Sequence, residues 1–221
     1  MIKVYYIDLS KIELDNSYIK LLSQNRIDKL LNSNPVFFKQ GVITELLVSY
    51  LFNQLKIPHH ELNLKYDEQG CPNYHHSYHV SISHSKDLIT VCLTKDKFGL
   101  DAQVVKDKYQ QLGKIIYNDD EKKVFKNISL DVCNVFSAKE AVLKLLSIGL
   151  NVSLKSITII NNIATFNKKQ FFLNTVKISV NNEPYFINMA SHTPFKTSLK
   201  NVNIKKFINY INEIGENYGS I

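Results

Sequence analysis

The stretch Phe136-Ser-Ala-Lys-Glu-Ala-Val-Leu-Lys144 places one carboxylate and two ammonium groups in an otherwise apolar segment. Apolar spacing around it predicts a helix over residues 131–147. Glu140 and Lys144 are four residues apart and therefore face the same way on such a helix. Lys139 lies about 100° around the axis, so Lys139 and Glu140 can flank a ligand from adjacent angles.

These charges also have a purely structural interpretation. Ser137 with Glu140 fits a capping box, and Glu140 with Lys144 is the favoured order of an ordinary helix ion pair. The apolar residues before Ser137 indicate, however, that the helix has already begun, which argues against a cap. An acid on the buried side of a helix needs a partner, and a divalent cation shared with Asp101 would supply one.

The rest of the chain predicts an α+β fold built from two pseudo-symmetric halves. In each half, helical spacing is followed by short strands separated by polar turns. The predicted helices cover residues 18–31, 35–54 and 131–147, and the predicted strands cover residues 79–82, 88–93, 98–101, 156–160, 170–180 and 185–191. We expect residues 1–105 and 106–221 to form the halves, each a long helix on a small antiparallel sheet. A site that uses both halves would lie in the groove between them.

The charge balance narrows the class of partner. The chain has 221 residues with 27 basic and 20 acidic side chains, a net charge of +7, and Arg26 as its one arginine. Base readout and bidentate phosphate binding rely on the guanidinium group, so a nucleic-acid-binding protein is not expected. Lysine binds phosphate as a point charge, which leaves phosphorylated ligands and acidic proteins as partners. An A/T-rich coding sequence is an alternative source of part of the lysine excess.

The sequence predicts a reduced, cytoplasmic protein that does not span a membrane. No apolar run approaches the roughly 20 residues needed to cross a bilayer. The first strand meets an acid at Asp8, unlike the longer apolar core of a signal peptide. Cys71, Cys92 and Cys133 are an odd number without metal-site spacing. Cys92 and Cys133 have apolar neighbours and are expected to be core thiols.

Two further stretches combine polar groups with strand ends. Val80-Ser-Ile-Ser-His-Ser85 runs from a strand into an expected turn, at residues 83–87, that is crowded with hydroxyls and one imidazole. Phe98-Gly-Leu-Asp-Ala-Gln103 ends a strand with a glycine and a single acid. Taken alone, His84 also fits a turn histidine that is bonded to the backbone.

Two other clusters are expected to be structural. His75, His76 and His79 look like a metal site, but His76 and His79 would point to opposite faces of an extended segment without a nearby carboxylate. The basic tail over residues 196–211 interleaves lysines with apolar residues. We expect it to be a solvated helix face with an apolar docking stripe, and an acidic partner is the alternative.

In combination, the polar stretches resemble a known signature. Ile82-Ser-His-Ser85, Gly99-Leu-Asp101 and Phe136-Ser-Ala-Lys-Glu140 followed by Lys144 resemble, in this order and spacing, the motifs of the 4′-phosphopantetheinyl transferases. The likeness is to the larger Sfp type, whose single chain contains two pseudo-symmetric halves, and it extends over about residues 26–190.

The resemblance implies transfer of the phosphopantetheine arm of coenzyme A to a serine of an apo acyl, peptidyl or aryl carrier protein, with release of 3′,5′-ADP. It assigns Mg²⁺, or Mn²⁺ in its place, to Asp101, Glu140 and Gln103. Glu140 is expected to act as the general base and Lys144 to hold phosphate oxygens at the reacting centre. The expected contacts to coenzyme A are Arg26, Lys29, Ser83, His84, Lys139 and Lys144. The larger type is expected to act as a monomer.

The sequence departs from the family pattern at three positions. Gln103 stands where a second acid is usual, so one metal ligand would be a neutral amide oxygen. Cys71 replaces a common lysine, and Gln40 lies about where an arginine or histidine often occurs, so two cations near the coenzyme A phosphates are missing. An alternative function is therefore a non-catalytic homologue, weakened by Gln103, that binds coenzyme A or a carrier protein.

Overall fold

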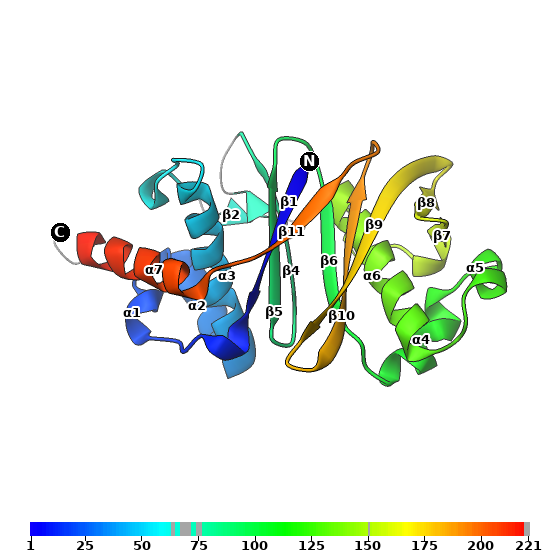
Figure 1. Cartoon of the computed structure of the whole chain (residues 1–221), viewed down its shortest axis with the longest axis horizontal. Helices are drawn as coiled ribbons and strands as arrows, with labels where there is room; N and C mark the ends of the chain where they lie inside the picture. Colours follow the sequence, from blue (N-terminus) through cyan, green and yellow to red (C-terminus); the bar gives the residue numbers. More distant parts are fainter. Residues whose placement is uncertain (63–64, 67–71, 74–76, 150, 219–221) are drawn as a thin grey trace.

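The chain folds into four layers, in the order helices, sheet, sheet and helices (Figure 1). This computed structural model describes residues 1–62, 65–66, 72–73, 77–149 and 151–218. Three apolar cores fill the spaces between the layers, one beneath each group of helices and one between the sheets. The predicted α+β class is confirmed. In the described part of the chain, no helix combines the length and apolar character needed to cross a membrane.

The first sheet has the strand order β11-β1-β5-β4. It contains β1 (Ile2–Asp8), β4 (His79–Ser85), β5 (Leu88–Thr94) and β11 (Thr197–Asn201), and the helices beside it are α1 (Asn16–Ile19), α2 (Gln24–Leu31), α3 (Pro35–Asn53) and α7 (Ile204–Tyr218). Helix α3 begins with a proline in its first turn, which the Asn34 side chain caps. Phe52 of α3 and Phe207 and Ile211 of α7 share the buried core on this side.

The second sheet has the strand order β6-β10-β9-β8-β7. It contains β6 (Gly99–Val104), β7 (Thr158–Ile160), β8 (Ile163–Phe166), β9 (Lys169–Val180) and β10 (Glu183–Ser191), with α4 (Lys108–Ile116), α5 (Asp119–Val124) and α6 (Ser129–Leu146) beside it. Helix α5 starts with a capping box between Asn118 and Glu121. Short elements complete the described chain, namely η1 (Leu9–Lys11), η2 (His59–Glu61), η3 (Leu154–Ser156), β2 (Lys65–Tyr66) and β3 (Pro72–Asn73).

A ladder of serine hydroxyls joins the two sheets where their edge strands β4 and β6 meet. Side chains at alternate strand positions point to the same side, so the serines at positions 81, 83 and 85 form one row. Their Oγ atoms accept hydrogen bonds from the backbone N–H groups of Leu100, Ala102 and Val104, at 3.0, 3.1 and 3.0 Å. We name this row the serine ladder. The serine hydroxyls accept the hydrogen bonds of buried β6 N–H groups. In a continuous sheet, backbone carbonyls of a neighbouring strand would accept them.

The division of the chain into halves differs from the predicted boundary at residue 105. Strand β6, which the prediction placed in the first half, belongs to the second sheet, where it pairs with β10. Strand β11 and helix α7, predicted in the second half, return to the first, where β11 runs parallel to β1. The physical reason is that β1 would otherwise present an open edge of unpaired N–H and C=O groups.

Two local predictions are wrong. Residues 83–85 belong to strand β4, and the turn is confined to Lys86 and Asp87, because the serine ladder keeps the strand extended to Ser85. The helix predicted over residues 18–31 is two helices, α1 and α2, separated at residues 20–23. The core thiols predicted at Cys92 and Cys133 are confirmed as buried free cysteines.

We predict that Ser81→Ala lowers the free energy of unfolding by about 1–3 kcal/mol, because the buried Leu100 N–H loses its acceptor. Urea unfolding at neutral pH measures the effect. Ser179→Ala, on the exposed side of β9, is the matched control and should change stability by no more than about 0.5 kcal/mol. Equal stability of the two variants would show that the serine ladder does not hold the sheets together.

Candidate active site

Strand β6 positions the central carboxylate of the site. Leu100 and Ala102 point into the core between the sheets, so Asp101 and Gln103 point to the opposite side, toward α6. Gly99 lies against the same helix, and a Cβ at this position would be 1.8 Å from the Ala141 carbonyl oxygen. The glycine of the motif therefore permits the close approach of β6 and α6 that brings their charged side chains together.

The Asp101 carboxylate is almost completely buried, at 1% exposure. Its Oδ1 accepts a hydrogen bond from Lys144 Nζ at 2.7 Å and from Ser83 Oγ at 2.8 Å. Lys144 also donates to the Ile82 carbonyl oxygen at 3.3 Å. Asp101 Oδ2 is buried and has no hydrogen-bond partner among the described residues. A buried carboxylate oxygen without a partner is costly, and a bound cation would satisfy it.

Glu140, from α6, is the second carboxylate of the site. Burial, and then the nearby negative charge of Asp101, raise its pKa to about 7, although the Lys144 ammonium opposes the shift. The carboxyl therefore exchanges its proton near neutral pH, which suits a general base. The same two carboxylates repel each other when both are charged, and a divalent cation between them would remove that repulsion.

The oxygen donors of this site fit Mg²⁺. In the described part of the chain, no cluster of three His, Cys, Asp or Glu side chains could hold a metal ion. Magnesium does not need such a cluster, because it is usually bound by one or two carboxylates together with water and substrate phosphate oxygens. Asp101 Oδ2 and Glu140 would supply the carboxylates. The histidines predicted not to form a metal site include His75 and His76, which lie outside the described residues.

Gln103, the predicted third metal ligand, contacts a tyrosine. Its Oε1 accepts a hydrogen bond from the Tyr109 hydroxyl at 3.0 Å. Tyr109 comes from α4, and burial raises its pKa, so the phenol stays protonated and donates. The neutral amide is therefore engaged with a tyrosine that the sequence did not single out, because nothing in the local pattern links residues of β6 and α4.

Ser83 and His84 occupy different environments although they are neighbours. Ser83 is buried in the serine ladder and donates to Asp101, so it orients the carboxylate, and its contact with coenzyme A stays a prediction. His84 lies beside the site, with part of its side chain exposed to solvent and part packed against its neighbours. Loss of hydration, followed by the Lys144 charge, lowers its pKa, although Asp101 opposes the change. The imidazole is therefore neutral at pH 7.

Two cations, Arg26 and Lys29, are expected to contact the far end of coenzyme A, and their surroundings differ. Arg26 Nε lies 2.8 Å from Oε1 of the fully buried Glu45, which balances its charge. Lys29 is exposed on α2. Gln40 is buried and donates to the Lys86 carbonyl oxygen at 2.8 Å, so it links α3 to the turn after β4. The substitution noted at position 71 lies outside the described residues.

Lys139 does not reach the site, which corrects the prediction that it binds phosphate. Its ammonium group is fully buried and lies 2.6 Å from Glu121 Oε2. The same group donates to the carbonyl oxygens of Ile116 and Leu154 at 2.7 and 2.9 Å. Three acceptors use all three of its protons. Glu121 lies in α5, beyond the reach of any local pattern, so the sequence could not indicate this pairing.

A cavity of about 400 Å³ opens between β4 and the C-terminal part of α6. Its lining includes Ser81, Ile82, Phe98, Glu140 and Lys144. The first three residues come from β4 and from the turn before β6, and the last two come from α6. The cavity is therefore lined by elements from both sides of the molecule, and the Glu140 carboxyl and the Lys144 ammonium group face it.

Residues 97–191 match the family model of the 4′-phosphopantetheinyl transferase superfamily. The match covers less than half of the chain. The resemblance predicted from the sequence is confirmed, while membership of the larger two-halved type stays a prediction. The matched segment includes Asp101, Gln103, Glu140 and Lys144, and the match supports a transferase activity. A comparison with curated proteins gave no match.

We predict that Lys139→Met lowers the free energy of unfolding by about 3–5 kcal/mol, because it leaves the buried Glu121 charge without its partner. Urea unfolding measures the loss. The control is Lys122→Met, which removes an exposed ion pair with Asp119 and should cost about 1 kcal/mol or less. A Lys139→Met protein of normal stability with weakened coenzyme A binding, measured by titration calorimetry, would return Lys139 to the phosphate contacts.

Proposed function

We propose that the protein transfers the 4′-phosphopantetheine group of coenzyme A to a serine of an apo carrier protein and releases 3′,5′-ADP. The observation that carries this proposal is the pair of carboxylates on β6 and α6. Asp101 has one oxygen held by Lys144 and one without a partner among the described residues, and Glu140 beside it has a pKa of about 7. Both residues lie in the segment that matches the transferase superfamily.

In this proposal Glu140 removes the proton from the carrier serine, whose hydroxyl is a poor nucleophile until it loses that proton. The serine Oγ then bonds to the phosphorus that carries the pantetheine arm. The bond from this phosphorus to the bridging oxygen breaks, and the oxygen leaves with 3′,5′-ADP. The proton stays on Glu140 and passes to solvent after release. Lys144 is held by Asp101 and Ile82, and its remaining proton can donate to a phosphate oxygen.

Asp101 and Glu140 would hold Mg²⁺, which when bound neutralises negative charge on the phosphate oxygens. Ser83 and Lys144 both hold Asp101 Oδ1, so the free Oδ2 is oriented before any cation arrives. Mn²⁺ prefers similar oxygen ligands and would occupy the same position. The carrier protein is the second substrate, and its acyl, peptidyl or aryl class depends on surface contacts outside this carboxylate pair.

A second candidate is a homologue that binds coenzyme A or a carrier protein without catalysis. The observation that favours it is the neutral Gln103 amide, which stands where the family pattern has a third acidic ligand and accepts a hydrogen bond from Tyr109. A site with one negative charge fewer holds a divalent cation less tightly. The two candidates differ in whether the carrier is modified.

We predict that wild-type protein, incubated with coenzyme A, Mg²⁺ and a panel of apo carrier proteins, adds the mass of one phosphopantetheine group to at least one carrier. Glu140→Gln should lower the rate by about 100-fold or more, because it removes the base. The control Glu13→Gln, an exposed residue after β1, should react like wild type. Intact-mass spectrometry over time measures the rates.

Equal rates for wild type and Glu140→Gln would contradict the proposed mechanism. If no carrier gains mass while calorimetry detects coenzyme A binding, the non-catalytic homologue is the correct candidate. If neither coenzyme A nor any carrier protein binds, both candidates are wrong.

A further inference from the structure

A second cavity, of about 1180 Å³, lies where β1 begins. Its walls come from β1, β11, the turn between β5 and β6, the end of α3 and the start of α7. It meets the Glu140 cavity at Lys97 and Phe98, which line both. We name it the β1 groove. It exceeds the roughly 300–1,000 Å³ typical of small-molecule sites, so a segment of a macromolecule fits it better.

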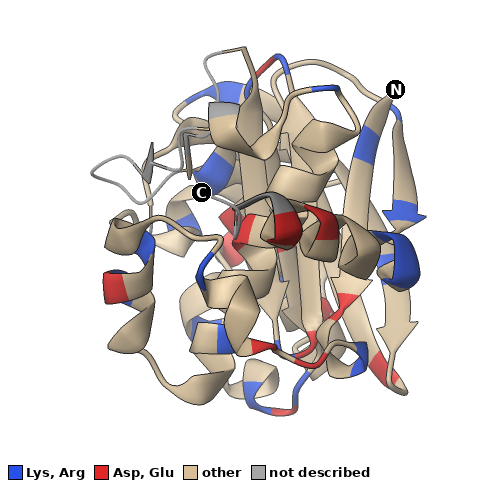
Figure 2. Ribbon diagram, turned by 90° about the vertical axis from the view of Figure 1, so that its left-hand side faces the viewer, with Lys and Arg blue, Asp and Glu red and all other residues tan. Residues whose placement is uncertain are grey.

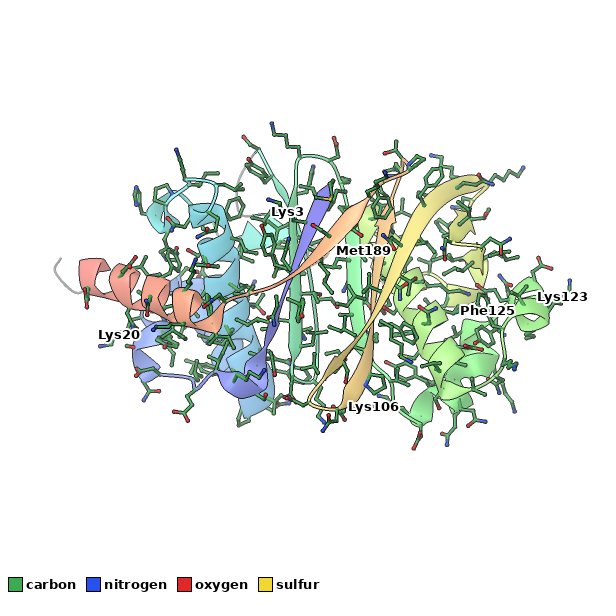
Figure 3. The ribbon with its side chains drawn as sticks, viewed as in Figure 1. Lys3, Lys20, Lys106, Lys123, Phe125 and Met189 are labelled. Atoms are coloured by element: carbon green, nitrogen blue, oxygen red, sulfur yellow. The ribbon has the colours of Figure 1, made fainter. Side chains whose placement is uncertain are left out.

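The β1 groove is strongly basic. Five lysines line it, namely Lys3, Lys95, Lys97, Lys200 and Lys206, and the acid in its lining is Asp96. Within the described part of the chain, none of these five ammonium groups forms an ion pair. Figure 2 shows basic segments on the strands and the helix nearest the N-terminus, and Figure 3 places Lys3 on β1. The charge favours an acidic occupant.

The aromatic residues of the groove argue against nucleic acid. Single-stranded nucleic acids bind to aromatic rings whose faces are free to stack with bases. Here Tyr50 packs edge-on against Phe207 and Tyr210, and Phe98 packs edge-on against Phe195. Tyr50, Phe98 and Phe195 line the groove and are already used in packing, and the chain has a single arginine, outside the groove. They form an apolar floor suited to aliphatic side chains.

The floor also offers hydrogen-bond donors. Tyr5 and Tyr50 both line the groove and are half-buried. Loss of hydration raises the pKa of each phenol, so both hydroxyls stay protonated and can donate to a carboxylate. A second copy of this chain would bring another net charge of +7, and the repulsion disfavours it as the occupant.

We propose that the β1 groove binds an acidic, amphipathic segment of a partner protein. Apolar side chains of that segment enter between Tyr5 and Tyr50, and its carboxylates contact the five lysines of the groove, which we name the lysine rim. The groove adjoins the Glu140 cavity at Lys97 and Phe98, but Glu140 and Lys144 do not line it, so its occupant does not contact them. It gives a function to lysines that the proposed transfer does not use.

The test uses the full-length protein and a fluorescein-labelled peptide composed of Glu, Leu and Phe, with binding followed by fluorescence anisotropy at low and high salt. The triple variant Lys3→Glu, Lys200→Glu, Lys206→Glu should weaken binding by about tenfold or more, because each contact becomes repulsive. The matched control is Lys168→Glu, Lys169→Glu, Lys177→Glu, which changes the net charge equally on exposed positions of β9 and the turn before it. It should bind the peptide like wild type.

A second variant, Lys95→Glu with Lys97→Glu in the β5–β6 turn, tests the same rim if the triple variant does not fold, and it should also weaken binding. The proposal is overturned if wild type does not bind the peptide, or if rim and control variants lose affinity equally. It is also overturned if a uridine oligonucleotide displaces the peptide from the wild-type protein at lower concentration than the unlabelled peptide does.

Discussion

The site depends on the serine ladder, which replaces a backbone ladder between β4 and β6. Both strands are at sheet edges, where unpaired N–H groups would be costly once buried. Hydroxyls at alternate positions of β4 accept from alternate N–H groups of β6 and so fix the register of one sheet against the other. The middle serine, Ser83, also donates to Asp101. One residue thereby couples the joining of the sheets to the orientation of the site carboxylate.

Helix geometry directs two nearby lysines of α6 to different places, Lys144 to the cavity and Lys139 into the core. Lys144 lies one turn beyond Glu140 and reaches Asp101 at the cavity. Lys139 is one residue before Glu140 and turns about 100° away, into the core, where Glu121 and two carbonyl oxygens hold it. A buried ion pair is stabilising only when its hydrogen bonds are complete, and this one has three. The Lys-Glu motif therefore places one charged side chain in the core and the next at the cavity.

Local periodicity is enough to predict some features and not others. The four-residue spacing on α6 predicts that Glu140 and Lys144 share a face, and the need of a buried acid for a cation links them to Asp101. The partner of Lys139 and the tyrosine on Gln103 come from distant segments, and hydroxyl side chains bond in too many contexts for the serines to reveal a ladder. The return of β11 to the edge of β1 is likewise a matter of tertiary pairing, which alternation within a strand does not encode.

Mn²⁺ can show whether a divalent cation and coenzyme A meet at Asp101 and Glu140. Mn²⁺ broadens nuclear magnetic resonance signals of nearby groups. With coenzyme A present, the account predicts that Mn²⁺ first broadens the amide signals of Asp101 and Glu140, that signals of α7 stay sharp, and that Asp101→Asn abolishes the effect. Broadening centred elsewhere, or unchanged in Asp101→Asn, would contradict it.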